Sequence, residues 1–95
     1  MPLDVLYKEF FGIQQGSESV TAYSTRLEAQ VNKISEVSGD SGTPSLIKAQ
    51  LIGHFFHNLS DPIRQAIRLV YKQPGVTYQQ LLEEALAVEG RGVLM

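Results

Sequence analysis

The sequence contains no cysteine, no excess of basic residues and no long apolar run. Without cysteine, disulfides, zinc ribbons and thiol chemistry are excluded. Ten acidic and eight basic residues give a net charge of −2, which is not the basic balance typical of a nucleic-acid-binding domain. No apolar stretch approaches the ~18 residues that a membrane-spanning helix needs, and Asp4 precedes any apolar run that a secretory signal would require. We therefore expect a cytoplasmic protein that makes no membrane contact through this domain.

The 95 residues, of which 43% are hydrophobic, are enough for a single small domain spanning residues 1–95. Apolar residues recur every three or four positions along most of the chain, and no long stretch alternates with the period of two that a strand requires. The predicted fold class is therefore all-α, a compact bundle of four to five helices. The predicted segments are a short helix at about 3–11, a turn and helix at about 15–36, and helices at about 44–58, 61–72 and 77–89.

Short polar residues and prolines mark where these helices should begin. Ser17 is the candidate N-cap of the second helix, Thr43-Pro44 opens the third, and Ser60-Asp61-Pro62 opens the fourth. Thr77 and Gln80 have the spacing of a capping box at the start of the last helix. The apolar stripes of these helices are Leu3, Leu6, Tyr7, Phe10 and Phe11; Val20, Tyr23, Leu27, Val31 and Ile34; Ile63, Ala66, Ile67 and Val70; and Leu81, Leu82, Ala85 and Val88.

The turn before the second helix carries the most informative pattern in the chain. Gly16 can adopt a positive φ and bring the preceding backbone close to the helix. Glu18, near the helix start, can accept hydrogen bonds from exposed N–H groups, and Gln15 offers both a donor and an acceptor. Arg26, two turns later, can reach back with a planar set of donors. These side chains predict a network that holds the turn against the helix, which is a structural task.

The order of Gln15-Gly16, Glu18, Tyr23 and Arg26-Leu27 resembles the major homology region of retroviral and retrotransposon Gag capsid proteins. That region places an aromatic residue five positions after the glutamate, an arginine three further on and an apolar residue next, as this chain does. The interval between the glycine and the glutamate is one residue shorter than in retroviruses. Residues 55–64 and 74–82 resemble the junctions between the later helices of the same family.

The chain resembles the C-terminal domain of a Gag capsid protein. Within that family it is most similar to gypsy-type LTR retrotransposon Gag and to its domesticated relatives, the paraneoplastic Ma antigen and Arc families. It implies a bundle of the retroviral capsid C-terminal domain type, in which Gln15, Gly16, Glu18, Tyr23 and Arg26 form a structural network. It further implies self-association through weak two-fold contacts in a shell, within a larger protein that assembles virus-like particles. RNA would then be bound only through other regions of that protein.

The third helix is the candidate interface. Its apolar residues cover nearly half of the helix surface, which is more than one core-facing stripe needs; they are Ile47, Leu51, Ile52, Phe55, Phe56 and Leu59. Either some of them stay exposed, or this helix is central and packed on two sides. The resemblance implies a two-fold dimer through this helix, and the matching face is Ile47, Gln50, Leu51 and His54, with Lys48 at its margin.

Other functions find less support in the residues. His54 and His57 have the spacing for a metal on one helix face, but no Cys, Asp or Glu stands beside them, so we expect neither a metal nor a cofactor. Arg64, Arg68, Lys72 and Arg91 form a short basic strip that would suit a helix-turn-helix, although a solvated helix face is the simpler interpretation. No catalytic motif is present, and we expect no enzyme activity. The alternatives to capsid assembly are a domesticated adaptor domain that binds a peptide between its helices and a SCAN-type dimerisation domain.

Overall fold

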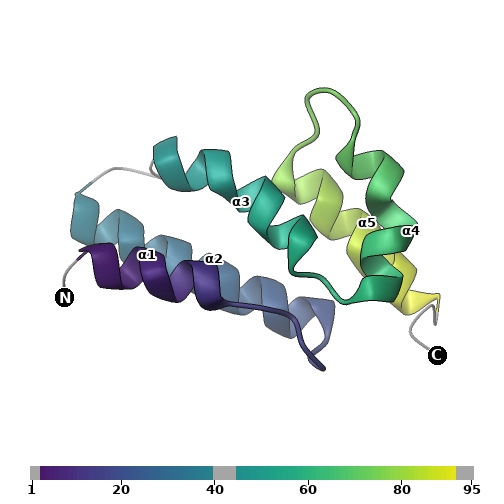
Figure 1. Cartoon of the computed structure of the whole chain (residues 1–95), viewed down its shortest axis with the longest axis horizontal. Helices are drawn as coiled ribbons and strands as arrows, with labels where there is room; N and C mark the ends of the chain where they lie inside the picture. The colour runs from purple at the N-terminus through teal and green to yellow at the C-terminus, as the bar shows by residue number, and fades with distance from the viewer. Residues whose placement is uncertain (1–2, 40–44, 92–95) are drawn as a thin grey trace.

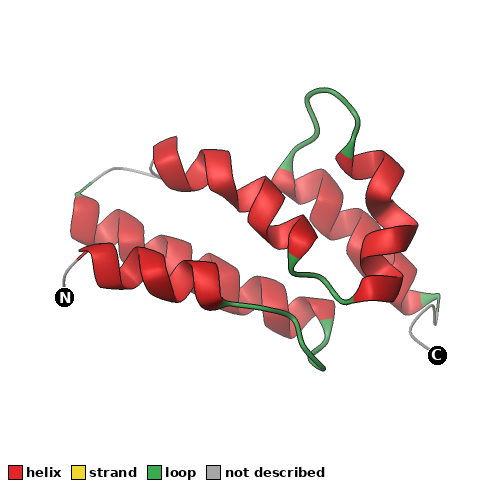
Figure 2. Ribbon diagram, viewed as in Figure 1, coloured by secondary structure: helices red, strands yellow, loops and turns green. Residues whose placement is uncertain are grey.

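The computed structural model describes residues 3–39 and 45–91, and the side chains of residues 45–49 lie outside this description. The chain forms α1 (Leu3–Gly12), α2 (Val20–Ser38), α3 (Ser45–His57), α4 (Asp61–Tyr71) and α5 (Tyr78–Gly90). No strand occurs in the described segments, as Figure 2 shows. The all-helical bundle expected from the spacing of apolar residues is confirmed. None of the described helices is long and apolar enough to cross a membrane.

The helices form two packed pairs, which touch each other through α2 and α5 and are bridged by α3. Figure 1 shows α1 and α2 running antiparallel along one side of the molecule, while α4 and α5 form a second pair at the other end. Helix α3 lies between the pairs and contacts α2 on one side and α4 and α5 on the other. The third helix is therefore central and packed on two sides, which accounts for its broad apolar coverage.

The core is built from the apolar stripes of all the helices. Its buried side chains are Leu6, Phe10, Val20, Tyr23, Leu27, Val31, Ile34, Phe55, Phe56, Leu59, Ile63, Ile67, Leu81, Ala85 and Val88. Every residue of the predicted α2 stripe belongs to this set. Two stripe predictions are wrong: Ala66 is exposed on α4 and Phe11 is 47% exposed on α1, because each lies at the solvent edge of its helix.

Side-chain capping bonds mark the starts of α2 and α5. The capping box of Thr77 and Gln80 is present with both of its hydrogen bonds, as predicted. Ser60 occupies the N-cap of α4 ahead of Pro62, but its hydroxyl makes no capping bond. The predicted opening of α3 at Thr43-Pro44 lies outside the described residues.

The molecule is thin. Its principal extents are 40 × 29 × 16 Å, and an α-helix with its side chains is about 10–12 Å across. A slab of this thickness cannot bury every helix on all sides. Each helix pair therefore presents a broad face to the surroundings.

Candidate functional site

Gln15 ties the turn between α1 and α2 to the segment that connects α3 and α4. Its side chain is only 1% exposed. Its Nε2 donates to the Glu18 carbonyl oxygen at 2.9 Å, and its Oε1 accepts from the Ser60 backbone N–H at 2.8 Å. Its own N–H donates to the Asn58 carbonyl oxygen at 3.1 Å. The amide therefore joins the turn to the connection between α3 and α4.

Gly16 supplies the backbone conformation that this turn requires. Its φ is +56°, as the sequence predicts, and this left-handed region is strained for residues with a Cβ. A Cβ built at this position would meet no atom within 4 Å. The glycine is therefore required by its backbone angle and not by lack of space.

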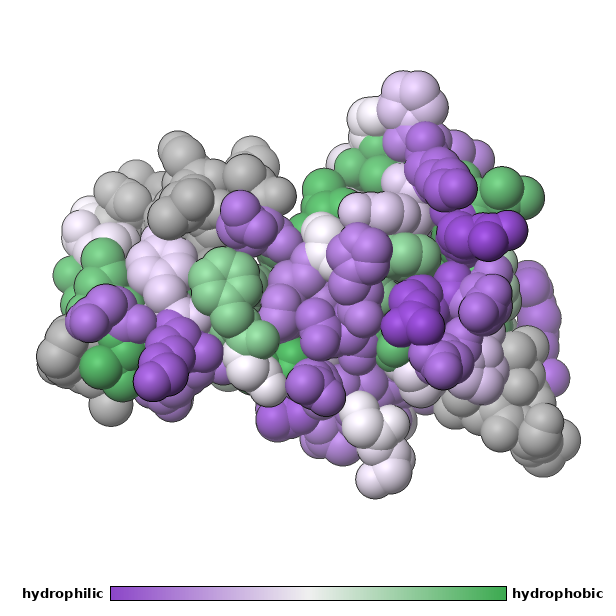
Figure 3. Space-filling view, in the orientation of Figure 1, coloured by the Kyte–Doolittle hydropathy of each residue, from purple (hydrophilic) through white to green (hydrophobic). Residues whose placement is uncertain are grey.

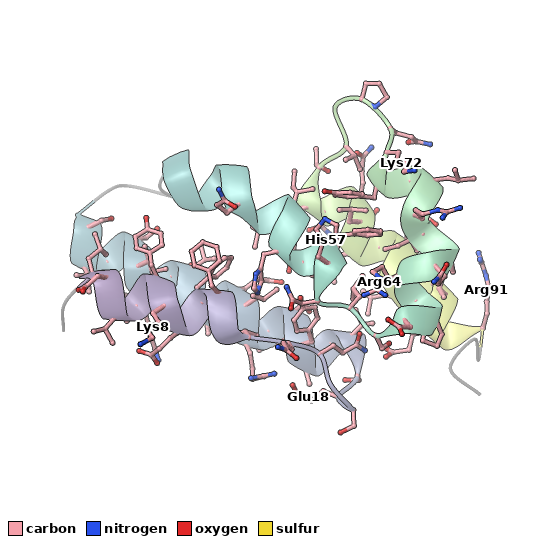
Figure 4. All side chains as sticks on the ribbon, viewed as in Figure 1. Lys8, Glu18, His57, Arg64, Lys72 and Arg91 are labelled. Carbon is pink, nitrogen blue, oxygen red and sulfur yellow. The ribbon has the colours of Figure 1, made fainter. Side chains whose placement is uncertain are left out.

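Arg26 holds the turn from the solvent side. Its Nη2 donates to the Gln14 carbonyl oxygen at 2.8 Å and also pairs with the Glu18 carboxylate. Figure 4 shows Glu18 in the turn that leads into α2. Both charged side chains are more than one third exposed, so water and salt screen their attraction. The reach of Arg26 back to the turn is as predicted.

Tyr23 links the start of α2 to the end of α3. Its ring stacks on Phe55 with a centroid separation of 5.4 Å, and its hydroxyl donates to the Phe55 carbonyl oxygen at 3.0 Å. Burial raises the pKa of the Tyr23 phenol well above its ordinary value. The structure thus brings Gln15, Gly16, Glu18, Tyr23 and Arg26 around one corner of the bundle, and we call these five residues the turn network.

The start of α2 differs from the sequence prediction in two ways. The N-cap is Ser19 and not Ser17, and its hydroxyl accepts from the Ala22 N–H at 3.1 Å. Glu18 does not cap the helix through its carboxylate, which faces Arg26 instead. The Val20 N–H is bound by Glu89 Oε2 at 2.8 Å, from the end of α5. No local pattern points to Glu89, because it lies 69 residues from its partner.

The residues of α3 that the sequence assigns to a two-fold interface have different surroundings in the structure. Gln50 is exposed, while Leu51 is half-buried and borders a groove with residues of α2 and α5. His54 is turned toward α1, where its ring lies against Phe10 at a centroid distance of 4.7 Å. The side chain of Ile47 lies outside the described residues, as does that of Lys48. The four positions share one side of α3 but do not form a uniformly open surface.

Both ring nitrogens of His54 are occupied within the chain. Nε2 lies 2.9 Å from the Ile13 carbonyl oxygen, and Nδ1 lies 3.3 Å from Asn58 Nδ2. A carbonyl only accepts and an amide NH₂ only donates, so the proton belongs on Nε2 and the ring is neutral. Burial lowers the pKa of His54, and the bond to Ile13 offsets only part of that shift.

The histidines of α3 do not converge on a shared site. His57 lies edge-on to Phe56 and Tyr71, whereas His54 faces Phe10 and Ile13. Among the residues described, no group of three or more His, Cys, Asp or Glu is placed to hold a metal ion.

Comparison with known proteins adds no relative: no family model, curated protein or solved structure matches the chain.

Proposed function

We propose that this chain is a self-association domain of a Gag-like, retrotransposon-derived capsid protein. In this role it forms weak two-fold contacts within a virus-like particle in the cytoplasm, carries no catalytic activity, and leaves RNA binding to other regions of the protein. The observation that carries the proposal is the turn network. The residues whose order resembles the major homology region are also residues that meet in space, and they lock the α1–α2 turn onto α2 and α3.

A rigid corner of this kind suits assembly better than catalysis. Its hydrogen bonds are mostly to backbone atoms, and they fix the angle between the first helix pair and α3. A subunit that repeats in a shell needs a fixed shape more than it needs a strong contact, because many weak contacts add up across a lattice. The thin form of the domain provides broad faces for such contacts.

The boundary between α1 and α3 is the surface we assign to self-association. Phe11 is 47% exposed there, and its ring lies 5.8 Å from the ring of His54. Gln50, one turn earlier on α3, is exposed, and Tyr7 is half-buried one turn before Phe11 on α1. We call Tyr7, Phe11, Gln50 and His54 the α1–α3 edge. Figure 3 shows apolar side chains reaching the surface where α1 runs below α3.

A two-fold contact through this edge would set the patch against its own copy. Aromatic residues are enriched in the central part of such interfaces, where they remove apolar area from water without ordering a flexible chain. A single exposed phenylalanine with a polar surround gives a small interface, below the ~1,200 Å² of stable complexes. The dimer should therefore be in rapid equilibrium with the monomer.

The test is the mass of the domain across a concentration series, by sedimentation equilibrium or light scattering. The unmodified chain should shift from monomer toward dimer as concentration rises into the millimolar range. Phe11→Glu places like charges across the axis and should abolish the shift, while circular dichroism stays unchanged because the side chain is outside the core. Leu69→Glu is the matched control, since Leu69 is 74% exposed on α4 and lies outside the edge. Loss of the dimer in Leu69→Glu but not in Phe11→Glu would refute this surface.

The adaptor alternative is favoured by a different observation. A groove of about 490 Å³ runs between α1 and α2, with Ile13 and Ala29 in its lining and with Glu9, Arg26 and Lys33 as its charged members. A groove of this size between helices can receive an extended peptide. A chain that stays monomeric at every concentration and binds a peptide through this groove would favour the adaptor over the assembly domain.

A further inference from the structure

A hollow at the corner between α3 and α4 is lined almost entirely by hydrogen-bond donors. It has a volume of about 220 Å³, and its lining residues are Phe56, His57, Arg64, Gln65 and Arg68. Phe56 forms an apolar wall that is stiffened by its stack on Tyr71, with ring centroids 4.0 Å apart. No carboxylate belongs to the lining.

The two arginines of this hollow are incompletely neutralised. Arg64 donates to the His57 carbonyl oxygen at 3.4 Å and pairs with Asp61, whose side chain is 76% exposed and therefore strongly solvated. The Arg68 guanidinium makes no ion pair and no hydrogen bond within the described part of the chain. The two are four residues apart on one helix, where like charges repel each other. An anion in the hollow would relieve this repulsion.

The local charge contrasts with that of the whole chain, which is −2. Figure 4 shows His57 and Arg64 beside each other where α3 gives way to α4, with Lys72 at the far end of α4. Figure 3 shows strongly hydrophilic side chains over α4 on the same face. A concentrated cluster of donors within an acidic protein is more selective for a compact anion than a generally basic surface would be.

We propose that this hollow binds a phosphate group carried by a small molecule. Arginine presents a planar set of donors that matches the geometry of phosphate oxygens, and the imidazole of His57 and the amide of Gln65 add two further donors. The hollow is smaller than the ~300–1,000 Å³ of sites for drug-sized ligands, so it holds a phosphate or pyrophosphate group and not a large cofactor. The apolar wall of Phe56 excludes water from one side and strengthens the charge-assisted bonds.

An extended nucleic-acid strand fits this surface less well. A strand needs a basic path of several nucleotides, usually with exposed aromatic residues on which the bases stack. Phe56 is buried, and Lys72 does not line the hollow. The concentration of donors at one point therefore favours a discrete phosphate group over a phosphodiester chain.

The experiment is a titration of the ¹⁵N-labelled chain with inorganic pyrophosphate at fixed ionic strength, followed by amide chemical shifts. Saturable shifts should be confined to residues around His57, Arg64 and Arg68. Arg68→Gln should weaken binding by about tenfold, the effect of losing one charge-assisted bond. Lys72→Gln removes the same charge at the C-cap of α4, outside the hollow, and should weaken binding by less than about twofold.

A further variant tests whether Arg64 itself contacts the phosphate group. Asp61→Asn removes the carboxylate that occupies Arg64, so pyrophosphate should bind about two- to fivefold more tightly than to the unmodified chain. Three results would overturn the proposal: no saturable shift, equal weakening in Arg68→Gln and Lys72→Gln, or unchanged affinity in Asp61→Asn. A single-stranded oligonucleotide that binds through these arginines while pyrophosphate does not would also overturn it, because the surface would then recognise a polyanion.

Discussion

The side-chain oxygen of Gln15 accepts a hydrogen bond from the backbone N–H of Ser60 across 45 residues of sequence, at a distance of 2.8 Å. The same side chain donates to the Glu18 carbonyl oxygen, so one amide satisfies two backbone groups that belong to different parts of the fold. Gln15 itself is buried, so removing its side chain takes the protein partner away from both backbone groups, which are only partly open to water. The stability of the corner between α1, α2 and α3 therefore depends on this residue more than on the charged pair beside it.

Gln15→Ala should lower the free energy of unfolding by about 1–3 kcal/mol, since it leaves a part-buried donor and a part-buried acceptor without their partners. Urea denaturation followed by circular dichroism measures the change. Gln14→Ala is the control, because Gln14 is exposed and only its backbone carbonyl is used. The control should change stability by less than ~0.5 kcal/mol. Equal effects from the two substitutions would show that Gln15 does not anchor the turn.

Gly16→Ala should destabilise the fold by about 1–2 kcal/mol through its backbone angle alone, because nothing near the position would clash with a methyl group. Gly16→Asn should cost less, since asparagine tolerates the left-handed region better than alanine does. Gly12→Ala provides the contrast: this glycine ends α1, has no positive φ, and faces open space. That substitution should be neutral or stabilising by up to ~1 kcal/mol. Thermal melts of the three variants give the ranking directly.

The ion pair between Glu18 and Arg26 should contribute little despite its place in the turn network. Both side chains are well solvated, and exposed pairs are worth about 0.2–1 kcal/mol. A double-mutant cycle of Glu18→Ala and Arg26→Ala should give a coupling energy below ~1 kcal/mol that shrinks as salt is added. A coupling that is larger than this and insensitive to salt would mean that the pair is more shielded from water than its exposure indicates.

Glu89→Ala should destabilise the fold by about 1–2 kcal/mol, because its carboxylate caps the Val20 N–H at the start of α2. Glu89→Gln should retain most of this stability, since an amide oxygen can accept the same bond. Glu84→Ala, an exposed acid on the same helix, controls for the loss of one negative charge. Chemical denaturation of the three variants at one ionic strength separates the hydrogen bond from the general charge effect.

The sequence predicts the features of this fold that depend on neighbouring residues. The α2 stripe from Val20 to Ile34 and the capping box of Thr77 and Gln80 are local patterns, and both are confirmed. The capping pattern alone does not decide whether Ser17 or Ser19 is the N-cap of α2, because both are serines that precede the helix. The Glu18 N–H donates to the Gln15 carbonyl oxygen at 3.0 Å, which closes a turn and delays the start of the helix by two residues.

Contacts between distant segments could not be predicted from the sequence. The sequence assigns His54 to an interface with another copy of the chain. In the structure α1 packs beside this part of α3, and His54 contacts Phe10 and Ile13 instead. Arg68 has the same neighbours in sequence as any helix-surface arginine, and only the fold places it beside Arg64 and His57 in one hollow. Spacing along a helix predicts which residues share a side, and it leaves open which other helix covers that side.

The stability of this fold should fall as the pH is lowered, because of His54. Burial holds the pKa of the folded His54 below its ordinary value of 6.5, so the unfolded chain binds a proton more readily than the folded chain. Stability is then complete above pH 6.5 and is lost progressively as the pH falls below that value. Protonation of Nδ1 also turns it into a donor that faces the Asn58 NH₂ group.

The measurement is the free energy of unfolding by urea at a series of pH values from 7.5 to 5. Because the ring is only partly buried, the slope should stay well below the ~1.4 kcal/mol per pH unit of one full proton. His54→Gln should be less stable at pH 7.5 but should show a flatter pH dependence. His57→Gln should keep the slope of the unmodified chain, since it leaves the contact between His54 and Ile13 in place. If His54→Gln retains the full slope, other groups titrate in this range and the junction of α1 and α3 does not sense the pH.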